Sequence, residues 1–149
     1  MDVKNVSSKT YVIKLHLIEL EPENFHIFAN GKWMGIPVNI IIDTGASHTC
    51  FDIDFFKSVN PEAIAIINHG TNVGIGTDEF ETHLAFITHF KISRFHVPDF
   101  HTVLLSLKHI NQAYQMAKIP EVQCILGSDF FVSYNAIIDF SNQTLTVHI

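Results

Sequence analysis

The sequence has 149 residues, which suffices for one domain with a substantial hydrophobic core. Hydrophobic residues make up 47% and charged residues 16%, and the mean hydropathy is +0.22, so part of the apolar surface is expected to be buried between subunits. The formal charge of −6 and the scattered Lys and Arg residues argue against a nucleic-acid partner, and no apolar run approaches the roughly 20 residues that span a membrane.

The first part of the chain, residues 1–24, is predicted as an N-terminal extension that contains one strand. Residues 1–10 are polar, with neither a basic leader nor an apolar stretch, which predicts a cytoplasmic protein without a signal peptide. Apolar side chains then alternate over Tyr11–Leu20, so the odd-numbered residues at the start of this strand are expected to share one face. Residues 25–149 are predicted to complete the same single domain.

A β-hairpin is predicted next, with strands over Phe25–Ala29 and Lys32–Ile42. Asn30 and Gly31 separate them, and this dipeptide favours a type I′ turn because both central residues of that turn need a positive φ. The second strand ends in a β-branched run that suits a buried position. It leads directly into Asp43.

An acidic turn follows this strand. Its residues are Asp43, Thr44, Gly45, Ala46 and Ser47. A carboxylate at the end of a rigid, buried strand is a candidate catalytic acid, and Gly45 permits the tight backbone that such a turn needs. Asp-Thr-Gly also occurs in turns, helix caps and metal-binding loops, so the motif alone leaves a structural role open.

The middle of the chain is predicted to contain a short helix or turn, a glycine-rich segment and a long strand. The helix or turn lies over Phe51–Ser58, before Pro61. The glycine-rich segment consists of Val73, Gly74, Ile75, Gly76 and Thr77. Its glycines permit either a hairpin tip that opens and closes or an ordinary turn. The strand is expected over His83–Ile92, with its even-numbered apolar residues on one face.

An amphipathic helix is predicted over Ser106–Lys118, where apolar residues recur at helical spacing before Pro120. After it come Ile125, Leu126, Gly127, Ser128 and Asp129. The first three predict a short buried strand, in which Gly127 lets a second backbone approach near the acidic turn. Ser128 is the expected N-cap of a helix that continues to about Tyr134. A hairpin of strands over Ala136–Phe140 and Thr144–Ile149 is expected to follow.

The acidic turn at 43–47 and the Ile-Leu-Gly-Ser-Asp segment at 125–129 resemble, in this order, the two landmarks of the retropepsin family of aspartic proteases. The resemblance extends from about Phe25 to Ile149, and the terminal hairpin is similar to that of cellular members of the DNA-damage-inducible type. It implies a mainly β, retropepsin-like fold with one closed β-barrel-like lobe per subunit, one or two short helices and a homodimer. The helix over Ser106–Lys118 departs from the retroviral members and is interpreted as a peripheral elaboration.

The same resemblance implies roles for individual residues. Asp43 is the catalytic acid, Thr44 hydrogen-bonds across a pair of such acids, and Ser47 hydrogen-bonds the outer oxygen of Asp43. The glycine-rich segment is the flap that closes over an extended peptide or protein substrate, where Ile75 favours apolar side chains. The remaining residues of the two landmarks support the site, namely Gly45, Ala46, Ile125, Leu126, Gly127, Ser128 and Asp129.

Peptide hydrolysis by this chemistry uses two carboxylates that share one proton, whereas the chain has a single Asp-Thr-Gly and no Asp-Ser-Gly. A symmetric homodimer would pair Asp43 with its copy, so the sequence predicts a dimeric aspartic endopeptidase with an inactive monomer and a mildly acidic pH optimum. A catalytically silent binding or scaffolding module with the same fold is the alternative. A serine or cysteine hydrolase is disfavoured, because neither Gly-x-Ser-x-Gly nor a Cys-His pattern occurs.

The other titratable residues are predicted to have structural roles. Asp129 complements the positive end of its helix, and Asp139 leads into a turn rather than into Thr-Gly. The ten His residues match no zinc-binding spacing, so neither a metal nor another cofactor is predicted. Cys50 and Cys124 are expected to be free and buried.

Overall fold

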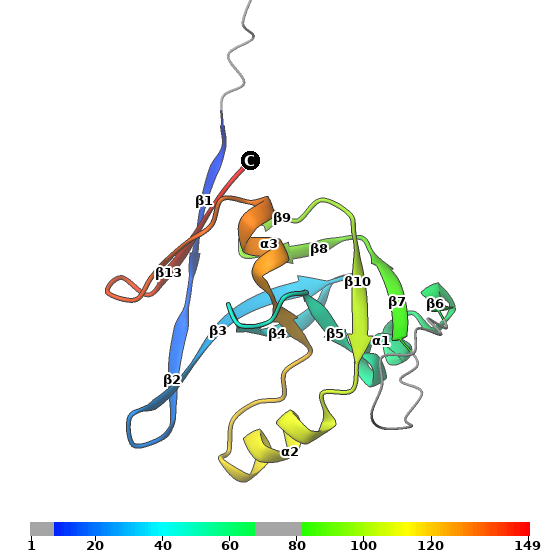
Figure 1. Cartoon of the computed structure of the whole chain (residues 1–149), viewed down its shortest axis with the longest axis horizontal. Coiled ribbons are helices and arrows are strands. Elements are labelled where there is room, and N and C mark those ends of the chain that lie inside the picture. The colour runs from blue at the N-terminus through cyan, green and yellow to red at the C-terminus, as the bar shows by residue number, and fades with distance from the viewer. Residues whose placement is uncertain (1–7, 68–81) are drawn as a thin grey trace, which may run out of the picture.

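The computed structural model describes residues 8–67 and 82–149, which form a mainly β fold with a few short helices (Figure 1). The elements are β1 (Thr10–Lys14), β2 (His16–Glu21), β3 (Asn24–Trp33), β4 (Ile36–Ile42), β5 (Cys50–Asp52), α1 (Ile53–Val59), the 3-10 helix η1 (Pro61–Ala63), β6 (Ile64–Ile67), β7 (Thr82–Ile87), β8 (Phe90–Ile92), β9 (Phe95–His96), β10 (Phe100–Leu105), α2 (Lys108–Met116), β11 (Cys124–Leu126), α3 (Ser128–Ser133), β12 (Ile137–Asp139) and β13 (Thr144–His148). None of the helices in these residues is long and apolar enough to cross a membrane.

Most of the strands form one curled sheet of mixed direction. Its order is β6-β7-β10-β5-β11-β4-β3-β8-β9, and β2 pairs with β3 (Figure 1). β11 lies between β4 and β5, parallel to the former and antiparallel to the latter. The chain thus returns late to insert a strand between two strands that are consecutive in sequence. Within residues 8–67 and 82–149 the outer strands β6 and β9 do not pair, so the sheet is a curled half-barrel and the predicted closed barrel is not confirmed.

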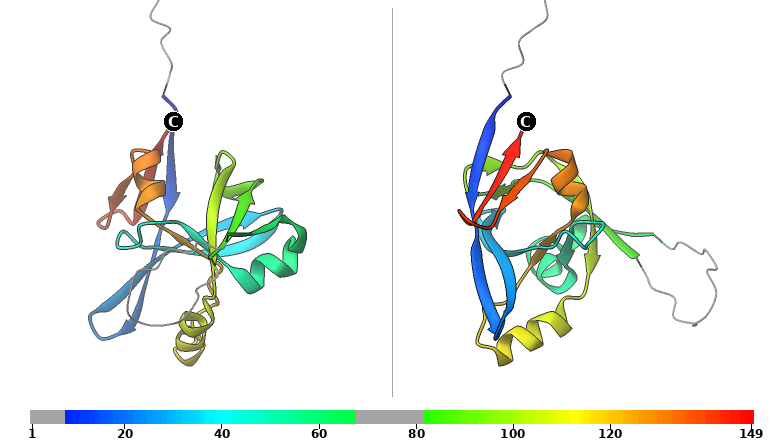
Figure 2. Two further views of the ribbon diagram at one scale, coloured as in Figure 1. Left: turned by 45° about the vertical axis from the view of Figure 1, so that its right-hand side comes forward. Right: turned by 60° about the vertical axis from the view of Figure 1, so that its left-hand side comes forward.

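The other strands form a three-stranded antiparallel sheet in the order β1-β13-β12. β1 and β2 continue one another as a long ribbon, of which β1 belongs to this sheet and β2 to the larger one (Figure 2). Ile13, Leu145 and Val147 are buried against the main core. The small sheet therefore joins both ends of the described chain to the body of the domain.

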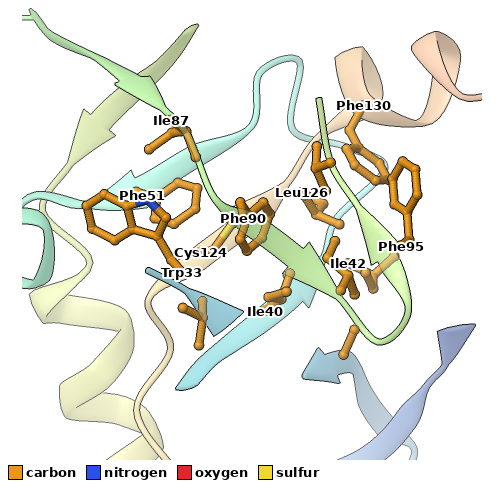
Figure 3. Packing of buried hydrophobic residues seen from close by; sticks show 14 of the residues in the cluster. Trp33, Ile40, Ile42, Phe51, Ile87, Phe90, Phe95, Cys124, Leu126 and Phe130 are labelled. Carbon is orange, nitrogen blue, oxygen red and sulfur yellow. The ribbon is translucent and has the colours of Figure 1, made fainter. Parts of the chain in front are cut away.

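Because side chains alternate along each strand, the large sheet has two apolar faces. One face carries the main core, where Ile40, Phe51 and Leu126 pack together from adjacent strands (Figure 3). The other face carries a smaller core that also includes residues of α2. The buried members of the smaller core are Phe28, Ile41, Cys50, Leu107, Tyr114, Val122 and Ile125.

The hairpin of β3 and β4 is present, but its predicted turn at Asn30-Gly31 is wrong. The strands continue further, and the turn is made by Met34 and Gly35, whose φ angles are 51° and 80°. Gly31 lies within β3, where an added Cβ would be 2.8 Å from the carbonyl oxygen of Lys91. The glycine therefore permits the close approach of β8, which is a tertiary requirement that local turn preference does not contain.

Two long predicted strands are each divided in the structure. The strand predicted over Tyr11–Leu20 becomes β1, which pairs with β13, and β2, which pairs with β3. The strand predicted over His83–Ile92 breaks at His89, whose φ is 54°, so that β7 pairs with β10 and β8 pairs with β3. The prediction that the even-numbered apolar residues share one face is therefore wrong, because Phe86 in β7 is 46% exposed whereas Phe90 and Ile92 in β8 are buried.

The remaining predicted elements are confirmed, with small shifts of their ends. α1 and α2 lie in the segments predicted as helical, β11 is the short buried strand, and β12 and β13 form the terminal hairpin. The N-cap of α3 is Gly127 rather than Ser128, which is already the first helical residue. The division into an extension at 1–24 and a core at 25–149 stays a prediction.

Candidate active site

Asp43 lies directly beyond the end of β4, where its N–H still donates to the carbonyl oxygen of Leu126 in β11 at 3.1 Å. The chain then turns sharply. The N–H of Ala46 donates to the carbonyl oxygen of Asp43 at 3.2 Å, and the N–H of Gly45 donates to the Asp43 carboxylate at 2.9 Å. Asp43, Thr44 and Gly45 are exposed. The turn therefore presents a carboxylate at the surface of the single chain on a backbone that hydrogen bonds hold in place.

The loop that follows Asp43 rests on the junction between β11 and α3. The N–H of Ser128 donates to the carbonyl oxygen of Ala46 at 2.8 Å. A Cβ on Gly127 would lie 2.6 Å from the carbonyl carbon of His48 and 2.8 Å from the carbonyl oxygen of Ala46. The predicted close approach of two backbones at Gly127 is confirmed. It brings together the two sequence segments, 43–47 and 125–129, that are far apart in the chain.

Asp129 holds the far end of the same loop through Thr49, which is 3% exposed. The N–H of Thr49 donates to the two carboxylate oxygens at 2.9 and 3.0 Å, and its hydroxyl donates to Oδ1 at 2.8 Å. The hydroxyl oxygen accepts the N–H of Gly127 at 3.1 Å. Asp129 lies in the first turn of α3, as predicted, and its bonds to Thr49 are a further contact that the sequence did not indicate. The sequence analysis missed Thr49, because nothing in a single sequence links a threonine to a carboxylate so far along the chain.

The predicted roles of Thr44, Ser47 and the glycine-rich segment need a second subunit or a bound substrate. In the structure as described, neither the Thr44 nor the Ser47 side chain hydrogen-bonds the Asp43 carboxylate, while the carbonyl oxygen of Ser47 accepts from the Ser128 hydroxyl at 3.4 Å. The roles of Thr44 and Ser47 beside a pair of acids therefore stay predictions. The glycine-rich segment at 73–77 lies outside the described residues, so its role as a flap also stays a prediction.

A pocket of about 590 Å³ opens beside Asp43. Asp43 is two residues beyond Ile41, so the alternation of side chains directs both to the face that carries the smaller core. The β2–β3 hairpin forms one wall, and α2, which lies next to that hairpin, forms another (Figure 2). The lining residues are Leu20, Glu21, Asn24, Phe25, His26, Ile27, Ile41, Ile42, Asp43, Ile110, Ala113, Tyr114, Ala117 and Ile125. A carboxylate at the edge of a mainly apolar pocket is suited to act on a bond whose neighbouring side chain enters the pocket.

Because α2 is a wall of this pocket, its interpretation as a peripheral elaboration is wrong. Asp52 holds the start of the helix, since its carboxylate accepts the N–H of Leu107 at 2.9 Å and also caps α1 by accepting the N–H of Phe55 at 3.1 Å. Asn111 holds the middle of the helix through two hydrogen bonds to the backbone of Val122, at 2.8 and 3.0 Å. These contacts fix the position of α2 over the smaller core.

His26 and Tyr114 form a polar pair in the pocket wall. His26 Nδ1 and Tyr114 Oη are 2.6 Å apart, which connects β3 to α2. Tyr114 is 4% exposed, and burial raises its pKa, with a further increase from the negative charge of Asp43. The sequence analysis missed this pair, because Tyr114 matched the apolar face of a helix and His26 lay within a predicted strand.

The two cysteines are free and buried, as predicted. Burial is the main cause that raises the pKa of the Cys50 thiol to about 11, and burial also raises the pKa of Cys124 well above its ordinary value. Both thiols therefore stay protonated near neutral pH, which makes them poor nucleophiles. The described part of the chain contains no group of three or more His, Cys, Asp or Glu side chains that could hold a metal ion.

Two solved structures have a similar fold. A retropepsin-like aspartic protease from Rickettsia conorii matches 99% of this chain and 97% of its own chain, with a TM-score of 0.53 and 14% sequence identity. The retroviral protease-like domain of Ddi1 from Leishmania major matches 80% of this chain and 86% of its own, with a TM-score of 0.54 and 14% identity. The fold is therefore mainly β and retropepsin-like.

A family sequence profile described as Aspartyl protease matches residues 29–130, a range that contains both the acidic turn and β11. The chain belongs to this aspartyl protease family. A search of curated proteins finds no match.

Proposed function

We propose that the protein is an aspartic endopeptidase that hydrolyses peptide bonds with a water molecule activated by Asp43 and the Asp43 of a second copy. The observation that supports this most strongly is the exposed Asp43 carboxylate, which lies beside a pocket on a turn held by backbone hydrogen bonds. Membership of the aspartyl protease family agrees with it.

The second copy is part of the proposal because the chain has one Asp-Thr-Gly and the reaction uses two carboxylates. Asp43, Thr44 and Gly45 are exposed in the single chain, so a two-fold axis beside this turn would bring two such turns together. Two adjacent carboxylates do not both ionise readily, and the pair therefore holds one proton in its working state. A mildly acidic pH optimum follows.

In the proposed reaction the ionised carboxylate takes a proton from water while the water oxygen attacks the carbonyl carbon of the peptide bond. The protonated carboxyl gives its proton to the carbonyl oxygen, which produces a neutral diol. One diol hydroxyl then returns a proton to the second carboxylate, the first carboxyl protonates the nitrogen, and the carbon–nitrogen bond breaks. One water is consumed and the pair regains its original protonation, without a metal or another cofactor.

The proposed substrate is an extended peptide or a flexible protein segment. The pocket lining is mainly apolar and includes Phe25, Ile41 and Ile110. We therefore expect the substrate side chain that enters the pocket, next to the scissile bond, to be largely apolar. Closure of a flap at 73–77, a cytoplasmic location and the absence of nucleic-acid or membrane partners stay predictions from the sequence.

The test is digestion of denatured casein and of a mixed peptide library between about pH 4 and 7, the range in which carboxylate pairs of this kind operate. Asp43→Asn is expected to lower the rate by roughly 10²–10⁴-fold or more, because it removes the acid–base group. Asp139→Asn is the matched control, since the same chemical change falls at the end of β12 in the small sheet, outside the pocket that Asp43 lines. Specific activity is also expected to rise with protein concentration as dimers form.

Cleavage by Asp43→Asn at the wild-type rate would contradict the proposal. A specific activity that stays constant on dilution to concentrations at which the protein is shown to be monomeric would also contradict it. Circular dichroism and size-exclusion chromatography of each variant show whether the fold and the dimer persist. A folded dimer without any cleavage would favour the catalytically silent binding module.

A further inference from the structure

The pocket wall contains a hydrogen-bonded pair that no step of the proposed reaction uses. His26 on β3 and Tyr114 on α2 share a hydrogen bond of 2.6 Å. Their rings also meet edge to face, with centroids 5.7 Å apart, and the ring of Phe28 packs against both. The pair therefore joins two walls of the pocket, and its orientation is fixed by packing as well as by the hydrogen bond.

Asp43 lies beside this pair. The antiparallel pairing of β3 with β4 ends at Phe28 and Ile41, and His26 and Asp43 each lie two residues beyond that last pair at the same end of the hairpin. His26, Tyr114 and Asp43 all line the same pocket. The charge of Asp43 is one cause of the raised pKa of Tyr114, which agrees with this proximity. A substrate side chain next to the reacting bond would meet the pair.

The pair leaves one hydrogen-bond donor and one acceptor for a ligand, whichever way the shared proton lies. If the Tyr114 hydroxyl donates to Nδ1 of neutral His26, the Nε2–H remains a donor and the phenolic oxygen an acceptor. If Nδ1–H donates to the phenolic oxygen, the hydroxyl remains a donor and Nε2 an acceptor. Within residues 8–67 and 82–149 neither side chain makes a second hydrogen bond. The ligand group that matches this pair both donates and accepts.

We propose that His26 and Tyr114 determine specificity by selecting a substrate side chain with an apolar ring and a terminal hydroxyl, so that tyrosine is preferred over phenylalanine beside the scissile bond. This inference rests on the proposed peptidase function. Phe25, Ile41 and Ile110 supply an apolar surface for the ring, and the pair supplies partners for the hydroxyl. A phenylalanine would leave the donor and the acceptor covered without partners, and a site built for a hydroxyl rejects an analogue that lacks it.

The test compares two peptides that differ only in having Tyr or Phe next to the scissile bond. The wild-type protein is expected to show a kcat/KM about three- to tenfold higher for the Tyr peptide, which is the ratio that one additional hydrogen bond typically produces. Tyr114→Phe keeps the buried ring and removes the hydroxyl, so this ratio is expected to fall to about one, chiefly through a higher KM for the Tyr peptide. Tyr134→Phe is the matched control, because it removes a hydroxyl from a residue packed against the main core, and the ratio is expected to persist.

Binding separates this inference from the proposed function. Peptides of the same pair with a reduced, non-cleavable bond are titrated into wild-type and Asp43→Asn protein. If no peptide is cleaved, the peptidase proposal fails. A higher affinity for the Tyr peptide than for the Phe peptide, lost in Tyr114→Phe, would still support the role of His26 and Tyr114 in specificity. Equal affinities, no binding of either peptide, or a ratio unchanged in Tyr114→Phe would overturn the inference. If Tyr114→Phe does not fold, His26→Leu at a partly exposed position replaces it, with the same expected loss.

Discussion

Replacing Gly127 by alanine tests whether the junction beneath the acidic turn holds Asp43 in place. The new Cβ would lie 2.6 Å from the carbonyl carbon of His48 and 2.8 Å from the carbonyl oxygens of His48 and Ala46. These are backbone atoms, so no side-chain rotation relieves the contacts. The backbone at Gly127, with φ of −99° and ψ of −177°, is extended and suits alanine, so the cost of the substitution is steric.

The expected loss of stability is about 3 kcal/mol, at the upper end of the range for overpacking, because rigid backbone surrounds the added methyl group. Relief requires the loop that follows Asp43 to move away from β11, and Asp43 would move with it. A displacement of about 1 Å at a reacting group costs on the order of a hundredfold in rate. Gly127→Ala is therefore expected to lose both stability and activity.

The assay is urea unfolding at one fixed protein concentration, since dimer formation would add to the apparent stability, together with peptidase activity below the unfolding transition. Gly35→Ala is the matched control. No atom lies within 4 Å of its added Cβ, but φ is 80°, so it is expected to lose only about 1 kcal/mol through backbone strain and to keep full activity. The steric reasoning is refuted if Gly127→Ala is as stable and as active as Gly35→Ala.

Two further changes test the hydrogen bonds of individual carboxylates. Asp129→Asn is expected to lower the free energy of unfolding by about 1.5–3 kcal/mol, because one hydrogen-bond donor of Thr49 would then face the amide NH₂ group, which cannot accept. Urea unfolding measures this loss. A loss no greater than that of Thr49→Ser would contradict the prediction. Hydrogen bonds from Ser141 and Asn142 lower the pKa of Asp139 from 3.8 to about 2, so its stabilisation is fully present above pH 3.8 and is lost as pH falls through about 2. Thermal unfolding should therefore show Asp139→Asn less stable than wild type at pH 5, with the difference shrinking as pH falls towards 2. A difference that stays constant with pH would disprove the linkage.

The sequence by itself determined the features that depend on neighbouring residues. The β-branched run before Asp43 predicts a buried strand that delivers a carboxylate into a turn, and the structure has β4 and that turn. The spacing of apolar residues over Ser106–Lys118 predicts α2, and the small residue at Gly127 predicts a close approach of two backbones. Each of these follows from local periodicity or from the size of one side chain, which a single sequence contains.

The tertiary structure alone decided the features that depend on residues far apart in the chain. The β3–β4 turn lies at Met34 and Gly35, because Gly31 is needed within the strand for the approach of β8. Thr49 meets Asp129, and α2 becomes a pocket wall, only after β11 is inserted between β4 and β5. The same folding brings His26 and Tyr114 together beside Asp43. Local preference does not encode these partners, because each contact forms only when long-range strand pairing sets the register.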